Sequence, residues 1–142
     1  ALLQTEGALP AHDIGERLGM SGSQVGRRRQ RLEAEGYILG APYRLNPDKL
    51  GLSVQAFIQI QTEAQRPETH DAITRLIAGQ PEIVAAWTLT GEADYSFRVY
   101  CENLSALNTL IQTRLLPHPS IGRVQSQIVM SQLKDDTALP LP

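Results

Sequence analysis

Residues 11–36 read AHDIGERLGMSGSQVGRRRQRLEAEG, and this stretch decides the fold of the first part of the chain. Apolar residues at spacings of three and four predict a helix over 11–18. Gly19 then supplies a turn, and Ser21 can accept a hydrogen bond from the amides that open the next helix. That helix is expected over about 23–35, where a glycine follows. The stretch therefore predicts a helix-turn-helix.

The second of these helices carries the side chains that a recognition helix needs. Val25, Arg29 and Leu32 form its expected inward stripe, with the stem of Arg29 along apolar surface and its head in water. Small or polar residues near the helix start can fit a DNA groove, and arginines on the same face can reach phosphates or guanine edges. The expected DNA-binding residues are Ser21, Ser23, Gln24, Arg27, Arg28 and Arg31.

Two interpretations of the arginine run are open. A charge run on a helix is usually only the solvated face of that helix. The preceding helix, the Gly-Met-Ser turn and the following Gly-Tyr-Ile instead favour a helix that reads a DNA groove. In that case Gln24 is expected to contact adenine and Arg27 or Arg28 guanine, while the other residues hold phosphates.

Charge is distributed unevenly along the chain. The formal net charge is −2 and the sequence pI is about 5.9, which excludes a generally basic nucleic-acid coat protein. Residues 1–50 carry seven Lys or Arg and six Asp or Glu, whereas residues 51–142 carry six and nine. Four arginines and no acidic residue lie between Ser21 and Leu32. Any affinity for double-stranded DNA must therefore come from this local patch.

The segment after the second helix predicts a wing and a linker. Residues 38–45, which Gly40 and Pro42 interrupt, are expected to form a short β wing, followed by a turn at Asn-Pro-Asp. This places a winged DNA-binding domain at 1–47 and a linker at 48–53. Because the chain begins with alanine and almost directly at a turn signal, we expect its first helix to be truncated.

From Val54 the hydrophobic period changes to two, which predicts strands between amphipathic helices. Helices are expected over 67–78 and about 105–115, and strands over 54–60, 83–90, 95–101 and 121–133. The order β-α-β-β-α-β is that of a ferredoxin-like domain, with two helices on one face of a four-stranded antiparallel sheet. The fold class is therefore α+β, with this domain at 54–135 and a tail at 136–142. The bare face of the sheet must be covered by something.

No motif for catalysis or metal binding is evident. His12, His70 and His118 lie far apart without partners at metal spacing, and there is no nucleophile elbow, phosphate loop or HExxH. Cys101 is the single cysteine, and its alternating apolar surroundings predict a buried strand position. No apolar run is long enough to span a membrane, and the first residues show no basic region followed by an apolar stretch and a cleavage site, so we expect an unexported protein. We expect no enzymatic activity, no cofactor, no membrane association and a cytoplasmic location.

Two motifs resemble the Lrp/AsnC (feast/famine, leucine-responsive) family of transcriptional regulators. Residues 14–21, IGERLGMS, resemble the family's leucine-alanine-x-x-valine-glycine-leucine-serine core. Residues 90–95, TGEADY, are similar to the glycine-x-x-aspartate hairpin of its ligand-responsive domain. Further matches to the family's pattern are Arg28, Leu32, Glu33, Glu35, Gly36 and Ile38.

The resemblance implies a dimer formed sheet against sheet, often joined into octamers as a tetramer of dimers. It also implies that a small-molecule effector, an amino acid, binds between dimers near the hairpin loop. A glycine there lets ligand and backbone approach closely, and a carboxylate can hold an α-ammonium group. Carried over to this sequence, the effector-binding residues are Gly91 and Asp94 in the loop and Gln127, Ile128 and Val129 on the last strand.

Departures from the family pattern keep alternatives open. Gly15 replaces an alanine at the tight helix contact and is expected to loosen it, Arg29 replaces an aliphatic residue, and Gly22 replaces a frequent proline. Gly15, Arg29 and the short N-terminus keep open the alternative of a ligand-binding protein whose helix-turn-helix is degenerate. Gly91 and Asp94 can also be structural residues of the turn. An enzyme resembling haem-precursor decarboxylases is a further alternative, although neither the hairpin nor the last strand holds a histidine. Trp87 and Phe97 are expected in the core or an interface.

Overall fold

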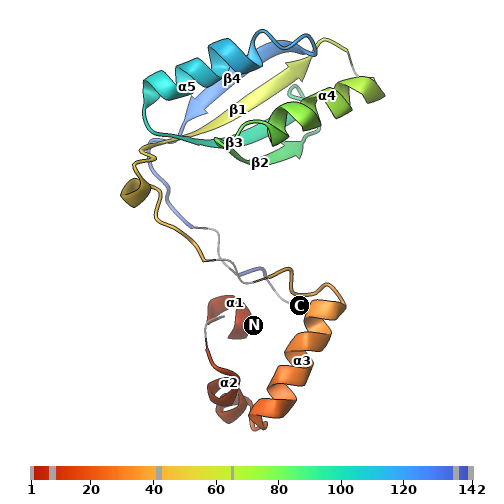
Figure 1. Ribbon diagram of the computed structural model, residues 1–142, viewed down its shortest axis with the longest axis vertical. Helices are drawn as coiled ribbons and strands as arrows, with labels where there is room; N and C mark the ends of the chain where they lie inside the picture. The colour runs from red at the N-terminus through yellow and green to blue at the C-terminus, as the bar shows by residue number, and fades with distance from the viewer. Residues whose placement is uncertain (1, 7–8, 41–42, 65, 136–137, 141–142) are drawn as a thin grey trace. The chain divides into compact units, whose positions relative to one another are not determined.

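The computed structural model describes residues 2–6, 9–40, 43–64, 66–135 and 138–140. It divides into two compact units (Figure 1). The first comprises Ala1–Arg44 together with Gln132–Pro142, and the second comprises Leu45–Ser131.

The described residues of the first unit form the helices α1 (Leu2–Thr5), α2 (Ala11–Leu18) and α3 (Gly22–Ala34). The predicted bounds of α2 are confirmed, and α3 begins and ends one residue earlier than predicted. Ile14 of α2 and Val25 of α3 are the buried apolar side chains of this unit. Their burial joins α2 to α3.

The turn between α2 and α3 depends on two glycines. Gly19 has φ 65°, the left-handed conformation that glycine adopts without strain, and its amide donates to the carbonyl of Gly15. Gly15 is buried, and a Cβ there would lie 2.4 Å from the backbone oxygen of Met20. The expectation that Gly15 loosens this contact is therefore wrong, because in this packing only glycine leaves room for the Met20 carbonyl.

The predicted β wing is not formed by the residues of this segment that the structure describes. The amides of Tyr37 and Ile38 both donate to the carbonyl of Leu32 and close the last turn of α3. Residues 38–40 and 43–45 belong to no strand, and residues 41–42 lie outside the described part of the chain. A strand requires a ladder partner, and alternating apolar residues alone do not supply one.

The second unit confirms the predicted β-α-β-β-α-β order. A 3-10 turn at Asp48–Leu50 precedes it, within the expected linker. All three strand pairings are antiparallel, and the strand order is β2-β3-β1-β4. The elements are β1 (Val54–Thr62), α4 (Pro67–Ala78), β2 (Ile83–Thr88), β3 (Tyr95–Cys101), α5 (Leu104–Leu110) with a π-helical continuation (Ile111–Leu115), and β4 (Ile121–Ile128).

Two predicted strands are too long at their C-terminal ends. The strand expected over 83–90 ends at Thr88, and the one expected over 121–133 ends at Ile128. The amide of Val129 still donates to the carbonyl of Gln55, but β1 begins at Val54 and offers no further partner. The bounds of α4 and β3 are as predicted.

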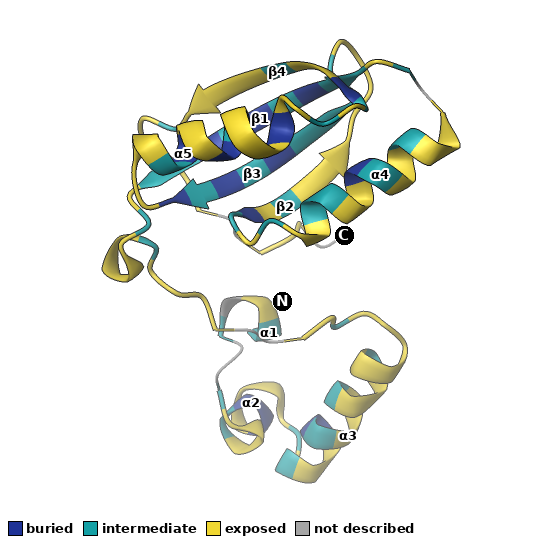
Figure 2. Ribbon diagram, turned by 45° about the horizontal axis from the view of Figure 1, so that its top comes forward, coloured by how far each residue is buried: buried dark blue, intermediate teal, exposed yellow. Residues whose placement is uncertain are grey.

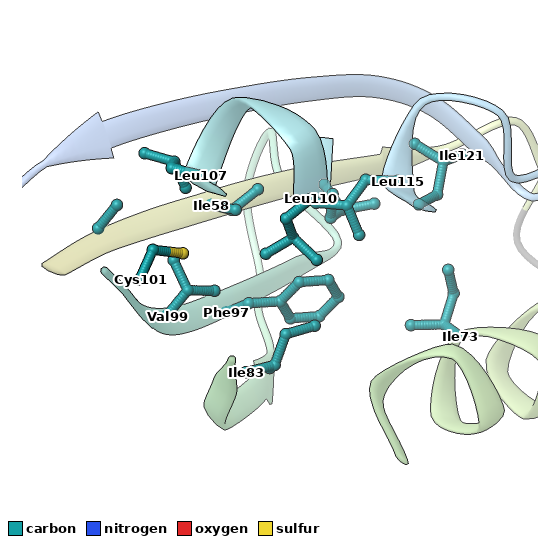
Figure 3. Packing of buried hydrophobic residues seen from close by; sticks show 12 residues of the cluster. Ile58, Ile73, Ile83, Phe97, Val99, Cys101, Leu107, Leu110, Leu115 and Ile121 are labelled. Atoms are coloured by element: carbon teal, nitrogen blue, oxygen red, sulfur yellow. The ribbon is translucent and has the colours of Figure 1, made fainter. Parts of the chain in front are cut away.

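Both helices cover the same face of the sheet and bury one continuous core (Figure 3). Phe97 and Cys101 project from β3 into this core, which confirms the predicted burial of both. Figure 2 shows that buried residues concentrate on β1 and β3, whereas β4 is mostly exposed. The core residues are Ala56, Ile58, Ile60, Ile73, Ile83, Phe97, Val99, Cys101, Leu107, Leu110, Leu115 and Ile121.

The opposite face of the sheet is polar with scattered aromatic residues. Phe57 is opposite Arg98 on β3 and opposite Gln127 on β4, so these side chains share the open face. Trp87 is opposite Ser96 on the same face, and 46% of its surface is exposed. Large apolar side chains on a polar, exposed face are typical of a surface that a partner covers.

Candidate DNA-binding helix and effector loop

The start of α3 is fixed by a capping box. The hydroxyl of Ser21 accepts a hydrogen bond from the amide of Gln24 at 3.2 Å, and the Gln24 side-chain oxygen accepts one from the amide of Ser21 at 2.9 Å. The Ser23 hydroxyl lies 3.0 Å from that of Ser21. The polar residues at the helix start are therefore already bonded to one another.

One face of α3 is exposed and basic. Gln24, Arg27, Arg28 and Arg31 are spaced three, four and seven residues apart, so they fall within about 100° of the helix circumference. All four are exposed, whereas Val25 on the inner side is buried. The structure thus brings the predicted recognition residues onto one surface.

The arginines of α3 differ in their partners. The Nε atom of Arg31 lies 2.7 Å from Oε1 of Glu35, and both side chains are exposed. Within the described residues, no hydrogen bond or ion pair engages Arg27 or Arg28. Two guanidinium groups on this face are therefore available without breaking an existing pair.

Arg29 lies apart from the basic face. It is half-buried on the inner side of α3, and its Nε atom is 3.0 Å from Oε1 of Glu33. This agrees with the expectation that its stem lies along apolar surface while its head reaches solvent. The ion pair means that the charge of Arg29 does not disturb the packing of α3.

The loop between β2 and β3 is attached to the end of β1. The Asp94 carboxylate accepts hydrogen bonds from the Thr62 amide and hydroxyl, each at 2.8 Å, and the Asp94 amide donates to the Ile60 carbonyl at 2.9 Å. Gly91 is exposed, with φ 108°. Asp94 therefore has a structural role in the loop, one of the alternatives that the sequence left open.

Replacing Asp94 by alanine is expected to lower the free energy of unfolding of the second unit by about 2 kcal/mol, because the partly buried Thr62 amide and hydroxyl lose a charged acceptor. Asp94→Asn keeps an acceptor and is expected to lose less. The matched control is Asp71→Ala, at an exposed position on α4. Urea unfolding of the full chain checks this, and equal effects of Asp94→Ala and Asp71→Ala would contradict it.

A shallow cavity of about 190 Å³ adjoins this loop on the helix-covered side of the sheet. It combines the Arg66 guanidinium with the Asp94 carboxylate and several hydroxyl groups. The Tyr95 hydroxyl lies 3.1 Å from Nδ1 of His70, and burial, followed by the charge of Asp94, raises the pKa of Tyr95. The lining residues are Thr62, Arg66, Thr69, Thr88, Asp94 and Tyr95. Opposite charges beside hydroxyl groups suit a small zwitterion.

Sequence reasoning missed the other lining residues of this cavity. Arg66 precedes α4, Thr62 ends β1 and Thr88 ends β2, so no local motif connects them. The only available signal was that strand ends next to a hairpin must lie at the same edge of a sheet.

The expected effector residues on the last strand lie elsewhere. Gln127 and Ile128 pair with Phe57 and Ala56, near the start of β1, whereas Asp94 binds Thr62 at its end. Five residues of strand span about 17 Å. Gln127 also points to the open face and Ile128 to the other. Within one chain, the structure does not bring these residues together with the loop.

Neither a membrane-spanning helix nor a metal cluster is found in the described part of the chain. Its helices are too short or too polar to cross a bilayer. Over the same residues, no group of three or more His, Cys, Asp or Glu side chains could hold a metal ion.

A capped helix with an exposed basic face, following a glycine turn and accompanied by an α+β unit, defines the class of helix-turn-helix transcriptional regulators with a second domain. Family models agree: the AsnC-type helix-turn-helix domain matches residues 1–33, and the Lrp/AsnC ligand binding domain matches residues 55–139. The chain therefore belongs to the Lrp/AsnC family of transcriptional regulators, which confirms the resemblance.

Individual relatives agree with this assignment. The chain is 30% identical over 140 residues to the HTH-type transcriptional regulator Zrp of Zymomonas mobilis, covering 99% of this chain and 91% of the relative. It is 28% identical over 141 residues to the DNA-binding transcriptional activator DecR of Escherichia coli, covering 99% and 93%. A transcriptional regulator of Neisseria meningitidis in complex with L-methionine superposes with a TM-score of 0.92 at 28% identity, covering 98% and 90%.

Proposed function

We propose that α3 of this regulator enters the major groove of double-stranded DNA with the face formed by Gln24, Arg27, Arg28 and Arg31. Ser21 and Ser23 then lie near the phosphates at the helix start. The observation that carries the proposal is the pair of exposed guanidinium groups of Arg27 and Arg28 on a capped helix, which have no hydrogen-bond or ion-pair partner among the described residues. Fluorescence anisotropy tests it: DNA upstream of the chain's own gene should bind more tightly than random DNA, and equal affinities would contradict the proposal.

The same proposal assigns a role to each segment of the chain. Residues 1–47 bind DNA, residues 48–53 link, residues 54–135 bind the effector and assemble the protein, and residues 136–142 form a tail. The family-model matches at 1–33 and 55–139 support the two domains. The tail has a contact of its own, because the Leu139 amide donates to Oε1 of Gln4 at 2.7 Å.

The proposed effector is an amino acid. The Neisseria meningitidis regulator and a feast or famine regulatory protein of Mycobacterium tuberculosis, 26% identical to this chain, are solved in complexes with L-methionine. In this chain the cavity at the hairpin offers Arg66 to an α-carboxylate and Asp94 to an α-ammonium group. Because Gln127, Ile128 and Val129 lie at the other end of β1, a site that also includes them needs residues from more than one chain.

An amino acid that binds this cavity is expected to stabilise the full chain by about 2.7 kcal/mol when its concentration is 100 times its dissociation constant. Thermal-shift screening against the twenty amino acids measures this. Arg66→Ala should abolish the shift by removing the carboxylate partner, whereas Arg75→Ala, at an exposed position on α4, should preserve it. A shift that survives Arg66→Ala would place the effector elsewhere.

The proposed assembly is a homodimer that pairs through the open faces of the two sheets, with a tetramer of dimers as the larger form. A single recognition helix reads only half of a two-fold symmetric operator, so specific binding favours a dimer. The exposed Trp87 and the half-buried Phe57 on the open face support this surface. A cytoplasmic location and a role without enzymatic activity complete the proposal, in keeping with relatives that are transcriptional regulators.

A further inference from the structure

We infer that base recognition by α3 rests on Arg27 and Arg28, which read guanines in each half-site, and that Gln24 does not read adenine. The inference rests on the proposed DNA-binding function and deepens it by naming the base that the recognition face selects. It follows from how the polar groups of this helix are already used within the protein.

The side-chain oxygen of Gln24 is already hydrogen-bonded at the start of α3. To pair with adenine, a glutamine must accept from the N6 amino group with its oxygen and donate to N7 with its nitrogen. Here the side-chain oxygen of Gln24 already accepts a hydrogen bond from the backbone amide of Ser21 at 2.9 Å. The Ser21 hydroxyl in turn accepts one from the backbone amide of Gln24 at 3.2 Å. Turning the side chain towards a base would open the capping box and leave the Ser21 amide without its acceptor.

Arg27 and Arg28 face no such competition. Both are exposed, and within the described residues neither guanidinium group has a hydrogen-bond or ion-pair partner. The planar guanidinium group matches O6 and N7 of guanine with two parallel hydrogen bonds. Arg29 and Arg31, in contrast, are already bonded to carboxylates at 3.0 and 2.7 Å.

Position along the helix leads to the same assignment. With Ser21 as the N-cap, Arg27 and Arg28 are the sixth and seventh residues of α3, in the half of the helix that approaches base edges in this motif. Around the helix axis, Arg27 and Arg28 lie on opposite sides of the line that joins Gln24 to Arg31, each about 50° from it. Arg31 lies one turn further from the helix start, beside Glu35, where it suits a phosphate.

The test uses the full chain and a duplex enriched by it from a random 20-base-pair library. Replacing half-site guanines by 7-deazaguanine removes the N7 acceptor and leaves base pairing intact. Because O6 remains and one of the two hydrogen bonds of the bidentate contact is lost, we expect each critical substitution to weaken binding by about 2- to 12-fold. Replacement of adenines by 7-deazaadenine should change affinity by less than about twofold.

Charge-conserving variants separate base reading from phosphate binding. Arg27→Lys and Arg28→Lys keep the positive charge and lose the forked donor, so each should reduce the preference for guanine over 7-deazaguanine. The matched control is Arg31→Lys on the same face, which should keep the full preference. Gln24→Glu retains an acceptor for the Ser21 amide, and it should also keep the guanine preference although its charge lowers affinity.

The outcomes separate this inference from the function on which it rests. Specific binding that is insensitive to 7-deazaguanine, or that is sensitive to 7-deazaadenine and lost in Gln24→Glu, overturns the inference and leaves the DNA-binding function standing. Failure of the library to enrich any sequence overturns both. Loss of guanine preference in Arg27→Lys or Arg28→Lys, with Arg31→Lys unaffected, supports the inference.

Discussion

Replacing Arg27 and Arg28 together by alanine is expected to weaken binding to the operator by at least about 30-fold at fixed salt concentration. Each bidentate contact between arginine and guanine contributes about 1–3 kcal/mol of discrimination, and every 1.4 kcal/mol is tenfold in affinity. Neither side chain supports the fold, because both are exposed and neither is bonded to the described residues. Anisotropy titrations of operator and random duplexes at the same ionic strength measure the loss.

The control for this variant removes the same charge from the other unit. Arg75→Ala with Arg114→Ala changes two exposed arginines of α4 and of the π-helical turn after α5, and should leave affinity within about twofold. Similar losses in the two double variants would mean that net charge alone drives binding. An unchanged affinity of the Arg27 and Arg28 variant would remove α3 from the DNA interface.

Replacing Gly15 by valine is expected to destabilise the helix-turn-helix by about 3 kcal/mol. A Cβ at this position would lie 2.4 Å from the Met20 carbonyl oxygen, and backbone cannot move aside as a flexible side chain can. Amide hydrogen exchange of the full chain measures the effect unit by unit. Protection in α2 and α3 should fall by roughly 100-fold, while protection in β1 and β3 should not change.

Gly26→Val on α3 is the matched control, because no atom lies within 4 Å of a Cβ built there. Valine is slightly better than glycine within a helix, so protection should stay the same or rise slightly. Equal protection in the Gly15 and Gly26 variants would show that the Met20 carbonyl gives way, and that the glycine is not required by the turn.

The degenerate helix-turn-helix that the sequence suggested is not favoured by the structure. Gly15 makes the close approach to Met20 possible, and Arg29 forms an ion pair with Glu33. In the sequence alone, Gly15 and Arg29 both depart from the residue types that the family pattern has at these positions. Their neighbours explain them: Glu33 lies four positions from Arg29 on the same helix, and Met20 lies five positions from Gly15 in the turn before α3.

Element positions were predictable wherever a local interaction decides them. The bounds of α2, α4 and β3 agree with the prediction because spacing, capping residues and prolines act within a few residues. The described residues of 38–45 form no wing, and the last strand ends earlier than predicted, for one shared reason. Apolar residues continue past Ile128 and recur through 38–45, but strand formation needs a ladder partner that local sequence does not specify.

The two candidate sites differ in the same way. The recognition face lies on a single helix, so the 3.6-residue period alone placed Arg27, Arg28 and Arg31 together. The capping box engaging Gln24 could also have been read from Ser21-x-x-Gln24, because it spans only three residues. The cavity at the hairpin is lined by Thr62 at the end of β1, Arg66 before α4 and Asp94 in the β2–β3 loop, and no single periodicity places these three residues together.

The sequence by itself thus determined the helix-turn-helix, the β-α-β-β-α-β order and the basic face of α3, because each depends on spacings within one element or on the order of elements. Tertiary structure alone decided which polar groups far apart in the sequence are bonded to one another. It placed the Asp94 carboxylate against Thr62, 32 residues away, and separated the loop from Gln127–Val129 by the length of β1. Within the helix-turn-helix, the need for glycine at position 15 also became evident only from the folded structure. The Met20 carbonyl lies against Gly15 only after the chain has turned between α2 and α3.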